Sequence, residues 1–277
     1  STSRRQRQMC IRDRPHTLQE FYNYKFREEG LSPKTLRNYH MALHKCLQQA
    51  VKERLLIYNP CDAVTLPSGE KPEIVVFTND QQRALVQASY RHRYGVFIRL
   101  DLCTGLRMGE LLALKWEDID FESGIISVTK TLYYKSMNEY TFVDPKTSAS
   151  IRTVVIDKDT IRELKDWMEV QKKVLKDCNF VLSYSGIPTS KHTLPRALEK
   201  LAGLAGVHRI KIHALRHSHV ALLISMGVNP LIVKDRLGHE KIQTTLGTYG
   251  HLYPNSNFEV AKMLGGIINF TPATESI

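Results

Sequence analysis

The chain has 277 residues, 42% of them hydrophobic, which is enough for one large domain or for two domains with hydrophobic cores. Its net charge of +11 at pH 7 indicates a polyanionic partner, although an ordinary basic protein would carry the same sign. No apolar run reaches the ~18–20 residues that span a bilayer, and five scattered cysteines without a C-x-x-C pair argue against a disulfide framework or zinc ribbon and for a reducing cytoplasm.

Residues 1–14 form a basic segment with five arginines, one aspartate and no helical or strand periodicity. The run resembles translated adapter sequence, so we expect it to be non-native and a natural N-terminal domain to be missing. The alternative is a basic arm that lies along nucleic-acid phosphates. Deletion of residues 1–14 separates the two interpretations, because only the loss of an arm would weaken nucleic-acid binding strongly.

A helical module is expected over residues 15–67. Ser32 and Pro33 are typical of the N-cap and first position of a helix, which continues to about Arg54. Apolar residues recur along it at intervals of three and four and give it one apolar face: Leu36, Tyr39, Leu43, Leu47 and Ala50. Five basic residues are candidates for phosphate contacts, with a solvated helix face as an equal alternative: Lys34, Arg37, Lys45, Lys52 and Arg54.

Residues 68–77 are predicted to link this module to a second one over residues 78–277, where Thr78 and Gln81 form a capping-box pattern. Helices are expected at about 79–89, 93–103, 159–176, 191–205, 213–226, 230–237, 241–248 and 257–267. Three β-rich runs are strand candidates: 125–129, 140–143 and 151–155. We expect a three-stranded sheet that holds Tyr133, Tyr134 and Tyr140. The fold class is therefore mainly α with a small antiparallel β-sheet (α+β).

Two arginines, two histidines and a tyrosine of the second module suit one site: Arg107 in TGLRMGE, His213 and Arg216 in IHALRH, His239 in LGH and Tyr249 in TYGH. His213 and Arg216 are three positions apart and share a helix face. Planar, permanently charged guanidinium groups bind phosphate oxygens bidentately. Because no carboxylate cluster accompanies them to hold a metal, the set suits attack of a tyrosine hydroxyl on a phosphodiester.

His213 and His217, four positions apart, raise the alternative of a metal site. The run is His-Ala-Leu-Arg-His, and it lacks the glutamate that follows the first histidine in the zinc motif H-E-x-x-H. We therefore expect no metal and no other cofactor.

The spacing of these residues resembles that of the tyrosine recombinase (phage integrase) family: three positions from His213 to Arg216, 23 to His239 and 10 to Tyr249. The resemblance covers about residues 15–268. It implies a helical core-binding domain over 15–67 and a catalytic domain with a C-terminal tail helix over 78–277. It also implies that Tyr249 cleaves DNA through a 3′-phosphotyrosine without ATP, and that Lys146 protonates the leaving 5′-oxygen.

The remaining roles follow from the same resemblance. Arg107 and Arg216 would clamp the non-bridging phosphate oxygens, and His239 would hydrogen-bond the phosphate. His213 would be the general base that takes the tyrosine proton. Glu110 would orient Arg107 without touching the DNA.

The interval from Arg107 to Lys146 is longer than Xer-type resolvases usually have, and it resembles integrases of conjugative transposons of Gram-positive bacteria. This resemblance predicts a site-specific DNA recombinase that integrates or excises a mobile element. One alternative is a Xer-like resolvase or topoisomerase-like cleavage and religation. Another, from a different class, is a DNA-binding regulator without catalysis.

The expected partners follow from that function. They are double-stranded DNA attachment sites, an excision factor, and three further copies of the chain in a homo-tetramer on two duplexes. The tail at 257–264 would dock on a neighbouring protomer, with packing on its own domain as the alternative. We expect no membrane partner and a place of action on the nucleoid in the bacterial cytoplasm.

Overall fold

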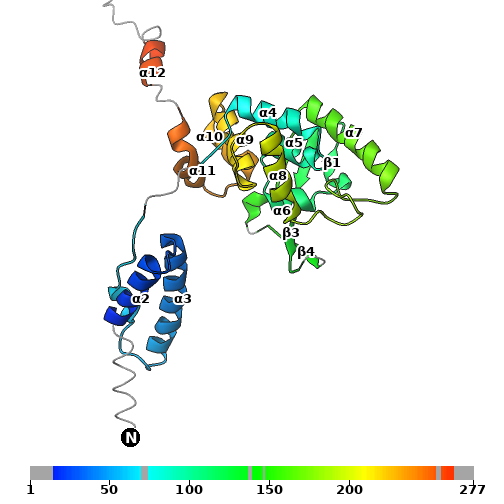
Figure 1. The fold of residues 1–277 in the computed structure, drawn as a ribbon. Helices are drawn as coiled ribbons and strands as arrows, with labels where there is room; N and C mark the ends of the chain where they lie inside the picture. Colours follow the sequence, from blue (N-terminus) through cyan, green and yellow to red (C-terminus); the bar gives the residue numbers. More distant parts are fainter. Residues whose placement is uncertain (1–14, 70–73, 137–138, 146, 254–256, 265–277) are drawn as a thin grey trace, which may run out of the picture. The chain divides into compact units, whose positions relative to one another are not determined.

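The computed structural model describes residues 15–69, 74–136, 139–145, 147–253 and 257–264. The basic segment 1–14 and Lys146 lie outside these residues. The chain divides into two compact units, residues 1–73 and 74–277, and this division falls within the predicted linker 68–77 (Figure 1). The assignment of the two units to core binding and to catalysis stays a prediction. No helix among the described residues has both the length and the apolar character needed to cross a lipid bilayer.

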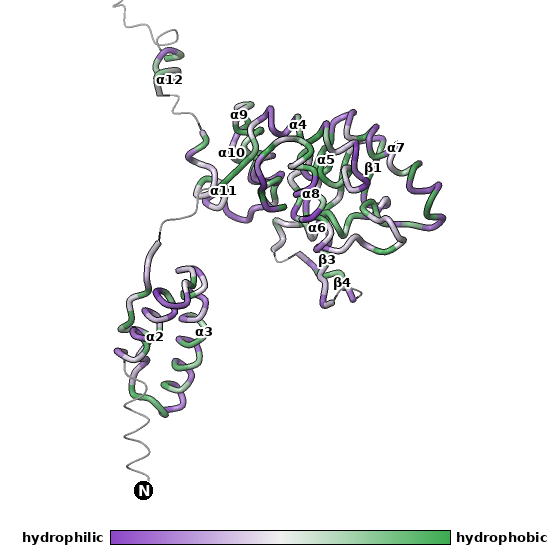
Figure 2. The backbone as a smooth tube through the Cα atoms, viewed as in Figure 1, coloured by the Kyte–Doolittle hydropathy of each residue, from purple (hydrophilic) through white to green (hydrophobic). Residues whose placement is uncertain are grey.

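The first unit contains two α-helices and a short 3₁₀-helix: α2 (Pro15–Arg27), α3 (Pro33–Lys52) and η1 (Pro60–Ala63). Helix α3 begins where the sequence predicts, because the Ser32 hydroxyl accepts a hydrogen bond from the Thr35 amide at 3.2 Å. It ends at Lys52, two residues before the expected end. Apolar and polar stretches alternate along α3 (Figure 2), as expected for a helix with one buried face. Three fully buried side chains come from the three elements: Tyr22, Leu36 and Cys61.

The second unit is mainly helical. Its α-helices are α4 (Asn79–Ser89), α5 (Gly95–Thr104), α6 (Met108–Ala113), α7 (Lys158–Val174), α8 (Thr193–Leu204), α9 (His213–Ser225), α10 (Pro230–Leu237), α11 (Ile242–Tyr249) and α12 (Asn257–Leu264). Three 3₁₀-helices in the described ranges are η2 (Trp116–Asp118), η3 (Ser148–Ser150) and η4 (Gly250–Leu252). The capping box of Thr78 and Gln81 is confirmed at the start of α4. The expected helices are all present, with ends that differ by a few residues.

The strands form two small antiparallel sheets. One has the order β1 (Ile119–Asp120), β2 (Ile125–Val128), β5 (Arg152–Val155), and the other pairs β3 (Thr131–Tyr134) with β4 (Tyr140–Val143). The expected single sheet that holds Tyr133, Tyr134 and Tyr140 is therefore wrong. Tyr134 faces Tyr140 in a local hairpin, and its hydroxyl donates to the carbonyl oxygen of Thr189 at 2.7 Å, which anchors the hairpin to a different part of the domain. The predicted class, mainly α with a small antiparallel β component, is confirmed.

Helix α5 lies at the centre of the second unit and packs against α4, α7 and α9. Its interior is apolar, and side chains such as Phe97, Ile98 and Leu100 are buried. The helix ends at Gly105, which has the left-handed φ of 62°. A Cβ atom there would lie 2.5 Å from the His219 ring of α9, so glycine is needed for the close approach as well as for the turn. The carbonyl oxygen of Gly105 accepts a hydrogen bond from Arg216 of α9 at this turn.

Candidate active site

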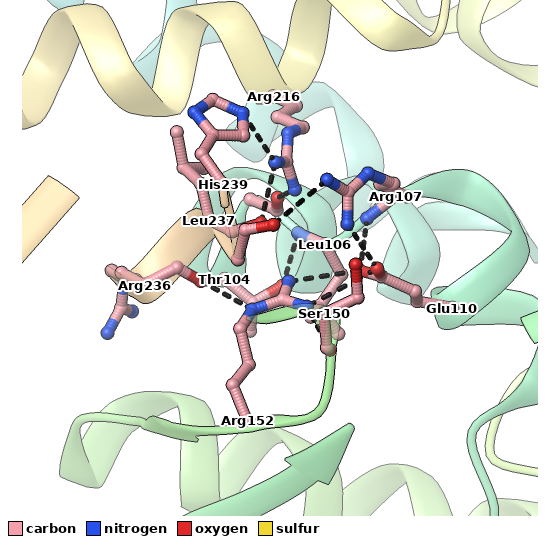
Figure 3. A network of polar contacts seen from close by, with 12 residues as sticks. Thr104, Leu106, Arg107, Glu110, Ser150, Arg152, Arg216, Arg236, Leu237 and His239 are labelled. Atoms are coloured by element: carbon pink, nitrogen blue, oxygen red, sulfur yellow. Dashed lines mark hydrogen bonds and ion pairs between the residues drawn. The ribbon is translucent and has the colours of Figure 1, made fainter. Parts of the chain in front are cut away.

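Arg216 of α9 belongs to a polar network that also contains Arg107, Glu110 and His239 (Figure 3). Its side chain is buried, and Nη1 donates to the Gly105 carbonyl oxygen at 2.6 Å. Nη2 donates to the Leu237 carbonyl oxygen at 2.8 Å and to His239 Nε2 at 3.2 Å. Burial and the nearby Arg107 lower the pKa of Arg216 to about 10, so the guanidinium keeps its charge at pH 7. The residue thus ties α9 to the turns after α5 and α10.

Arg107 reaches the same region from the turn before α6, where it is the N-cap residue. Its Nη1 donates to Glu110 Oε1 at 2.7 Å, and its Nη2 donates to the Gly238 carbonyl oxygen at 3.2 Å. Its backbone amide donates to Glu110 Oε2 at 2.9 Å, so one carboxylate fixes both ends of the residue. The Arg107 side chain is 37% exposed, which leaves part of the guanidinium open to a ligand.

Glu110 is shared between two arginines (Figure 3). Besides Arg107, it accepts from Arg152 Nη2 at 3.0 Å and Nη1 at 3.3 Å, and the Arg152 Nε donates to the Arg236 carbonyl oxygen at 2.8 Å. Burial raises the pKa of Glu110, but the bonds and charges of Arg152 and Arg107 outweigh burial and hold the pKa below its usual value. Glu110 was expected to orient Arg107. The ion pair of Glu110 with Arg152 of β5 could not be predicted, because the sequence around Arg152 shows only a strand-like run.

His239 follows Gly238, which ends α10 with a left-handed φ of 65°. An arginine only donates hydrogen bonds, so His239 Nε2 accepts from Arg216. Its Nδ1 then carries the hydrogen and donates to Thr245 Oγ1 at 2.9 Å. Burial, Arg216 and Arg107 lower the pKa of His239 to about 4, so the ring is neutral at pH 7.

Tyr249, the last residue of α11, is 2% exposed and lies in a small apolar cluster with residues of α9 and α10. Its hydroxyl is 2.6 Å from His217 Nδ1. Burial raises the pKa of Tyr249 to about 12, against the opposing effect of Arg216. Among the described residues, the hydrogen bond of this hydroxyl goes to His217 and not to His213, the general base that the sequence predicts. The His213 ring is exposed at the start of α9 and lies 4.7 Å, centroid to centroid, from that of His217.

An open cavity of about 360 Å³ lies beside the network. Its lining includes Arg107, His239, and both chain neighbours of Lys146, namely Pro145 and Thr147. Lys146 itself, the expected general acid, lies outside the described residues. One cationic side chain, Arg107, lines the cavity, and its partly exposed guanidinium can bind a phosphate oxygen there.

The other predicted site residues lie in the first unit or concern metal. The five basic candidates for phosphate contacts are all exposed: Lys34, Arg37, Lys45, Lys52 and Arg54. Exposure is needed for DNA contact, but any solvated face would show it. Within the described ranges, no three His, Cys, Asp or Glu side chains gather closely enough to hold a metal ion.

Comparison with known proteins gives three findings. The family described as "Phage integrase family" matches residues 75–256. The chain is 32% identical to the ICEBs1 integrase of Bacillus subtilis over 250 residues, covering 87% of this chain and 68% of that protein. It is 30% identical to a XerC-like tyrosine recombinase of Caldanaerobacter subterraneus over 275 residues, covering 90% of this chain and 70% of that one.

The fold is also similar to a solved structure of the Tn1549 transposon integrase in complex with a circular intermediate DNA. The TM-score is 0.76 at 22% sequence identity, and the similarity covers 93% of this chain and 86% of that one. This likeness shows the fold, which is mainly α with small antiparallel sheets.

Proposed function

We propose, for a chain that belongs to the phage integrase family of tyrosine recombinases, that Tyr249 cleaves DNA at a phosphate held by Arg107, Arg216 and His239. The protein is a site-specific recombinase, an integrase of a mobile element that cuts and rejoins DNA strands. The observation that carries the proposal for these residues is the convergence of both arginines on one turn. Arg107 donates to the Gly238 carbonyl oxygen, and Arg216 donates to Leu237 and to His239.

The chemistry is a transesterification. The Tyr249 oxygen attacks phosphorus, the bond to the 5′-oxygen breaks, and a 3′-phosphotyrosine and a 5′-hydroxyl result. Arg107 and Arg216 neutralise the charge that grows on the non-bridging oxygens, and loss of one such placed donor typically costs ~10²–10³ in rate. We propose Lys146 as the group that protonates the 5′-oxygen, which is consistent with the position of its two chain neighbours at the cavity.

No cofactor is needed in this scheme. The phosphotyrosine ester keeps the free energy of the broken phosphodiester, so a 5′-hydroxyl of another strand can attack it without ATP. The two guanidinium groups supply the positive charge that a metal ion supplies in other phosphoryl-transfer enzymes. The buried Arg216 suits this role because its fixed bonds leave little to reorganise during the reaction.

His213 is the general base that the sequence predicts. Although the residue as a whole is exposed, desolvation of part of its ring and the charges of Arg216 and Arg107 lower its pKa, so the ring is neutral and able to accept a proton at pH 7. Its exposure beside Arg216 also suits a contact with the phosphate. Since the Tyr249 hydroxyl is bonded to His217, His213 would need a different arrangement of the tyrosine to take its proton.

The proposed partner is double-stranded DNA that carries the attachment sites of the element. Exposed basic residues of α3, such as Lys34 and Arg37, would contact phosphates. Exchange of four strands requires four protomers on two duplexes, and the exposed apolar side chains of α12, with Phe258 at 91%, suit docking on a neighbouring protomer. An excision factor and action on the bacterial nucleoid belong to the same proposal.

Covalent trapping on a nicked duplex tests the role of Tyr249. The duplex carries a candidate attachment site, and the nick lets the short 5′-fragment diffuse away so that the adduct accumulates. We expect an adduct that survives denaturation, forms in EDTA, and is absent with Tyr249→Phe. Binding without any adduct on a panel of candidate sites would favour the DNA-binding regulator, and an adduct with Tyr249→Phe would refute the choice of nucleophile.

The similarity to a XerC-like protein keeps a second function in view, resolution or relaxation of DNA without integration. A pair of duplexes with different labels distinguishes the two. Recombinant strands that join the labels support the integrase, whereas religation within each duplex alone supports the alternative.

A further inference from the structure

His217 is the residue that contacts the reacting atom of the proposed nucleophile. Its Nδ1 lies 2.6 Å from the Tyr249 hydroxyl oxygen, and the two rings are 5.5 Å apart between centroids. His217 begins the second turn of α9, next to Arg216, while Tyr249 ends α11. Two separate helices therefore deliver the pair, and the Tyr249 side chain lies within a packed apolar cluster.

We propose that His217 is the proton acceptor for Tyr249, holding its hydroxyl before DNA cleavage and taking its proton as the tyrosine attacks phosphorus. This inference rests on the proposed function of Tyr249 as the nucleophile. It gives His217 a role that neither the spacing of the sequence motifs nor the comparisons assign, and it makes His213 a neighbour of the acceptor instead of the acceptor itself.

The proposed step balances as a transesterification with two proton transfers. The Tyr249 O–H proton moves to His217 Nδ1, and the oxygen forms a bond to phosphorus. The bond from phosphorus to the 5′-oxygen breaks, and that oxygen takes a proton from the Lys146 ammonium group. In religation the 5′-hydroxyl gives a proton back to Lys146, and the departing tyrosine oxygen recovers its proton from the His217 imidazolium.

The charges around the pair explain why the proton stays on the tyrosine until DNA arrives. The titratable and charged groups that face His217 are His213 and Arg216 on its own helix and Tyr249 on α11. Burial, His213 and Arg216 lower the pKa of His217 to about 4, and burial raises that of Tyr249 to about 12. A phosphate docked between the arginines brings negative charge, which stabilises the imidazolium and so favours the transfer.

A pair of asparagine variants separates holding from proton transfer. His217→Asn places an amide near the position of Nδ1, so it can keep a hydrogen bond to Tyr249 but cannot take a proton at neutral pH. His213→Asn makes the same substitution at the histidine one helical turn before His217. The exposed His251, outside the proposed site, gives the control His251→Asn.

The assay measures first-turnover cleavage from pH 5 to 9 on the nicked duplex that gives an adduct with the unmodified protein. A second substrate carries sulfur in place of the 5′-oxygen. Because a thiol is far more acidic than an alcohol, this leaving group departs without a proton, and the rate then reports the tyrosine side of the reaction alone. DNA affinity and thermal unfolding are measured for every variant.

We expect the unmodified protein and His251→Asn to have a rate that is level across this pH range, because the pKa of His217 lies at about 4 and the imidazole stays able to accept a proton. His217→Asn should cleave ~10²–10³-fold more slowly at pH 7 with either substrate. Its rate should rise about tenfold per pH unit, because the tyrosine must then lose its proton to hydroxide. A structural role would lower the rate evenly without this slope.

Two outcomes overturn the inference. One is a level profile for His217→Asn, and the other is loss of the level profile in His213→Asn instead. If His217→Asn loses DNA affinity or unfolds, ¹⁵N NMR of the unmodified protein decides: we expect His217 Nδ1 without a hydrogen, and a hydrogen on Nδ1 contradicts the proposal. An adduct with Tyr249→Phe would refute the proposed function of Tyr249 as well. If Tyr249→Phe forms no adduct but His217→Asn cleaves with the rate and pH profile of the unmodified protein, this inference alone is refuted.

Discussion

Glu110→Gln is expected to damage both stability and cleavage, because it removes a charge that two arginines share. The Glu110 side chain is 1% exposed and that of Arg152 is 6% exposed, so the ion pair has little access to water. Removal of one partner of a buried ion pair typically costs about 3–5 kcal/mol, since the other charge is left without compensation. The new amide also turns a donor toward one of the two guanidinium groups.

The consequence for cleavage follows from the position of Arg107. Its Nη1 and its backbone amide each donate to a different oxygen of Glu110, and glutamine keeps only one acceptor oxygen, so the variant loses at least one of the two hydrogen bonds that fix the residue beside the cavity. Misplacement of a catalytic group by about 1 Å can lower a rate ~10²-fold. We therefore expect a cleavage rate reduced by about that factor, with DNA affinity changed much less.

Urea denaturation and single-turnover cleavage measure the two effects. Glu169→Gln is the matched control, because Glu169 pairs with Lys172 at 62% and 59% exposure and such pairs contribute less than about 1 kcal/mol. A Glu110→Gln protein that unfolds within 1 kcal/mol of the original and cleaves at its rate would refute the view that Glu110 holds the two arginines.

Three further predictions concern the same network. Arg216→Lys should lower cleavage ~10²–10³-fold in single turnover, because one ammonium cannot bond the carbonyl oxygens of Gly105 and Leu237 together; a rate within tenfold of the original would contradict this. Gly238→Ala should lose about 2 kcal/mol in urea denaturation, since φ is 65° and the added Cβ would lie 2.9 Å from a carbonyl oxygen; unchanged stability would count against it. Burial and Arg236 lower the pKa of His219 to about 4, below its unfolded value near 6.5. The neutral ring therefore contributes up to about 3 kcal/mol to the free energy of unfolding above pH 6.5, and this contribution is lost as pH falls toward 4. His219→Asn should weaken that pH dependence of stability.

The spacing of motif residues carried most of what could be predicted about the site. The turn before Arg107 predicted its place at the start of a short helix. The resemblance to the recombinase family predicted that it shares a site with residues more than a hundred positions away, such as Arg216 and His239. The structure brings Arg107, Arg216 and His239 together, as expected. Their roles in DNA cleavage, like that of Tyr249, rest on the proposal and its tests.

The contact between His217 and Tyr249 could not be predicted from spacing. The two residues are 32 positions apart, and their meeting depends on how α9 and α11 pack. In the sequence, His217 stood out only as a possible metal ligand four positions from His213. The contact of Arg152 with Glu110 could not be predicted either. The sequence around Arg152 indicated a strand, but its hydrogen bond to Glu110 depends on how β5 and α6 pack in the folded domain.

The wrong sheet prediction has a physical cause in the shortness of the strands. Each of β2 to β5 has four residues, and a run that short does not specify its partner by pattern alone. The sequence run 131–134 was not among the strand candidates, so 140–143 had no local partner and was expected to lie in the same sheet as its neighbours. Pairing across the short turn between β3 and β4 needs less loop closure than the longer connection.

Identification of the residue joined to DNA tests the central claim most directly. After covalent trapping, the DNA is digested and the adduct is cut with trypsin, which releases the peptide that follows Lys241 and contains both Tyr249 and Tyr253. Fragmentation of this peptide in a mass spectrometer locates the nucleotide. The account predicts a nucleotide phosphate on Tyr249 alone; the same mass on Tyr253, or on a tyrosine elsewhere in the chain, would contradict it.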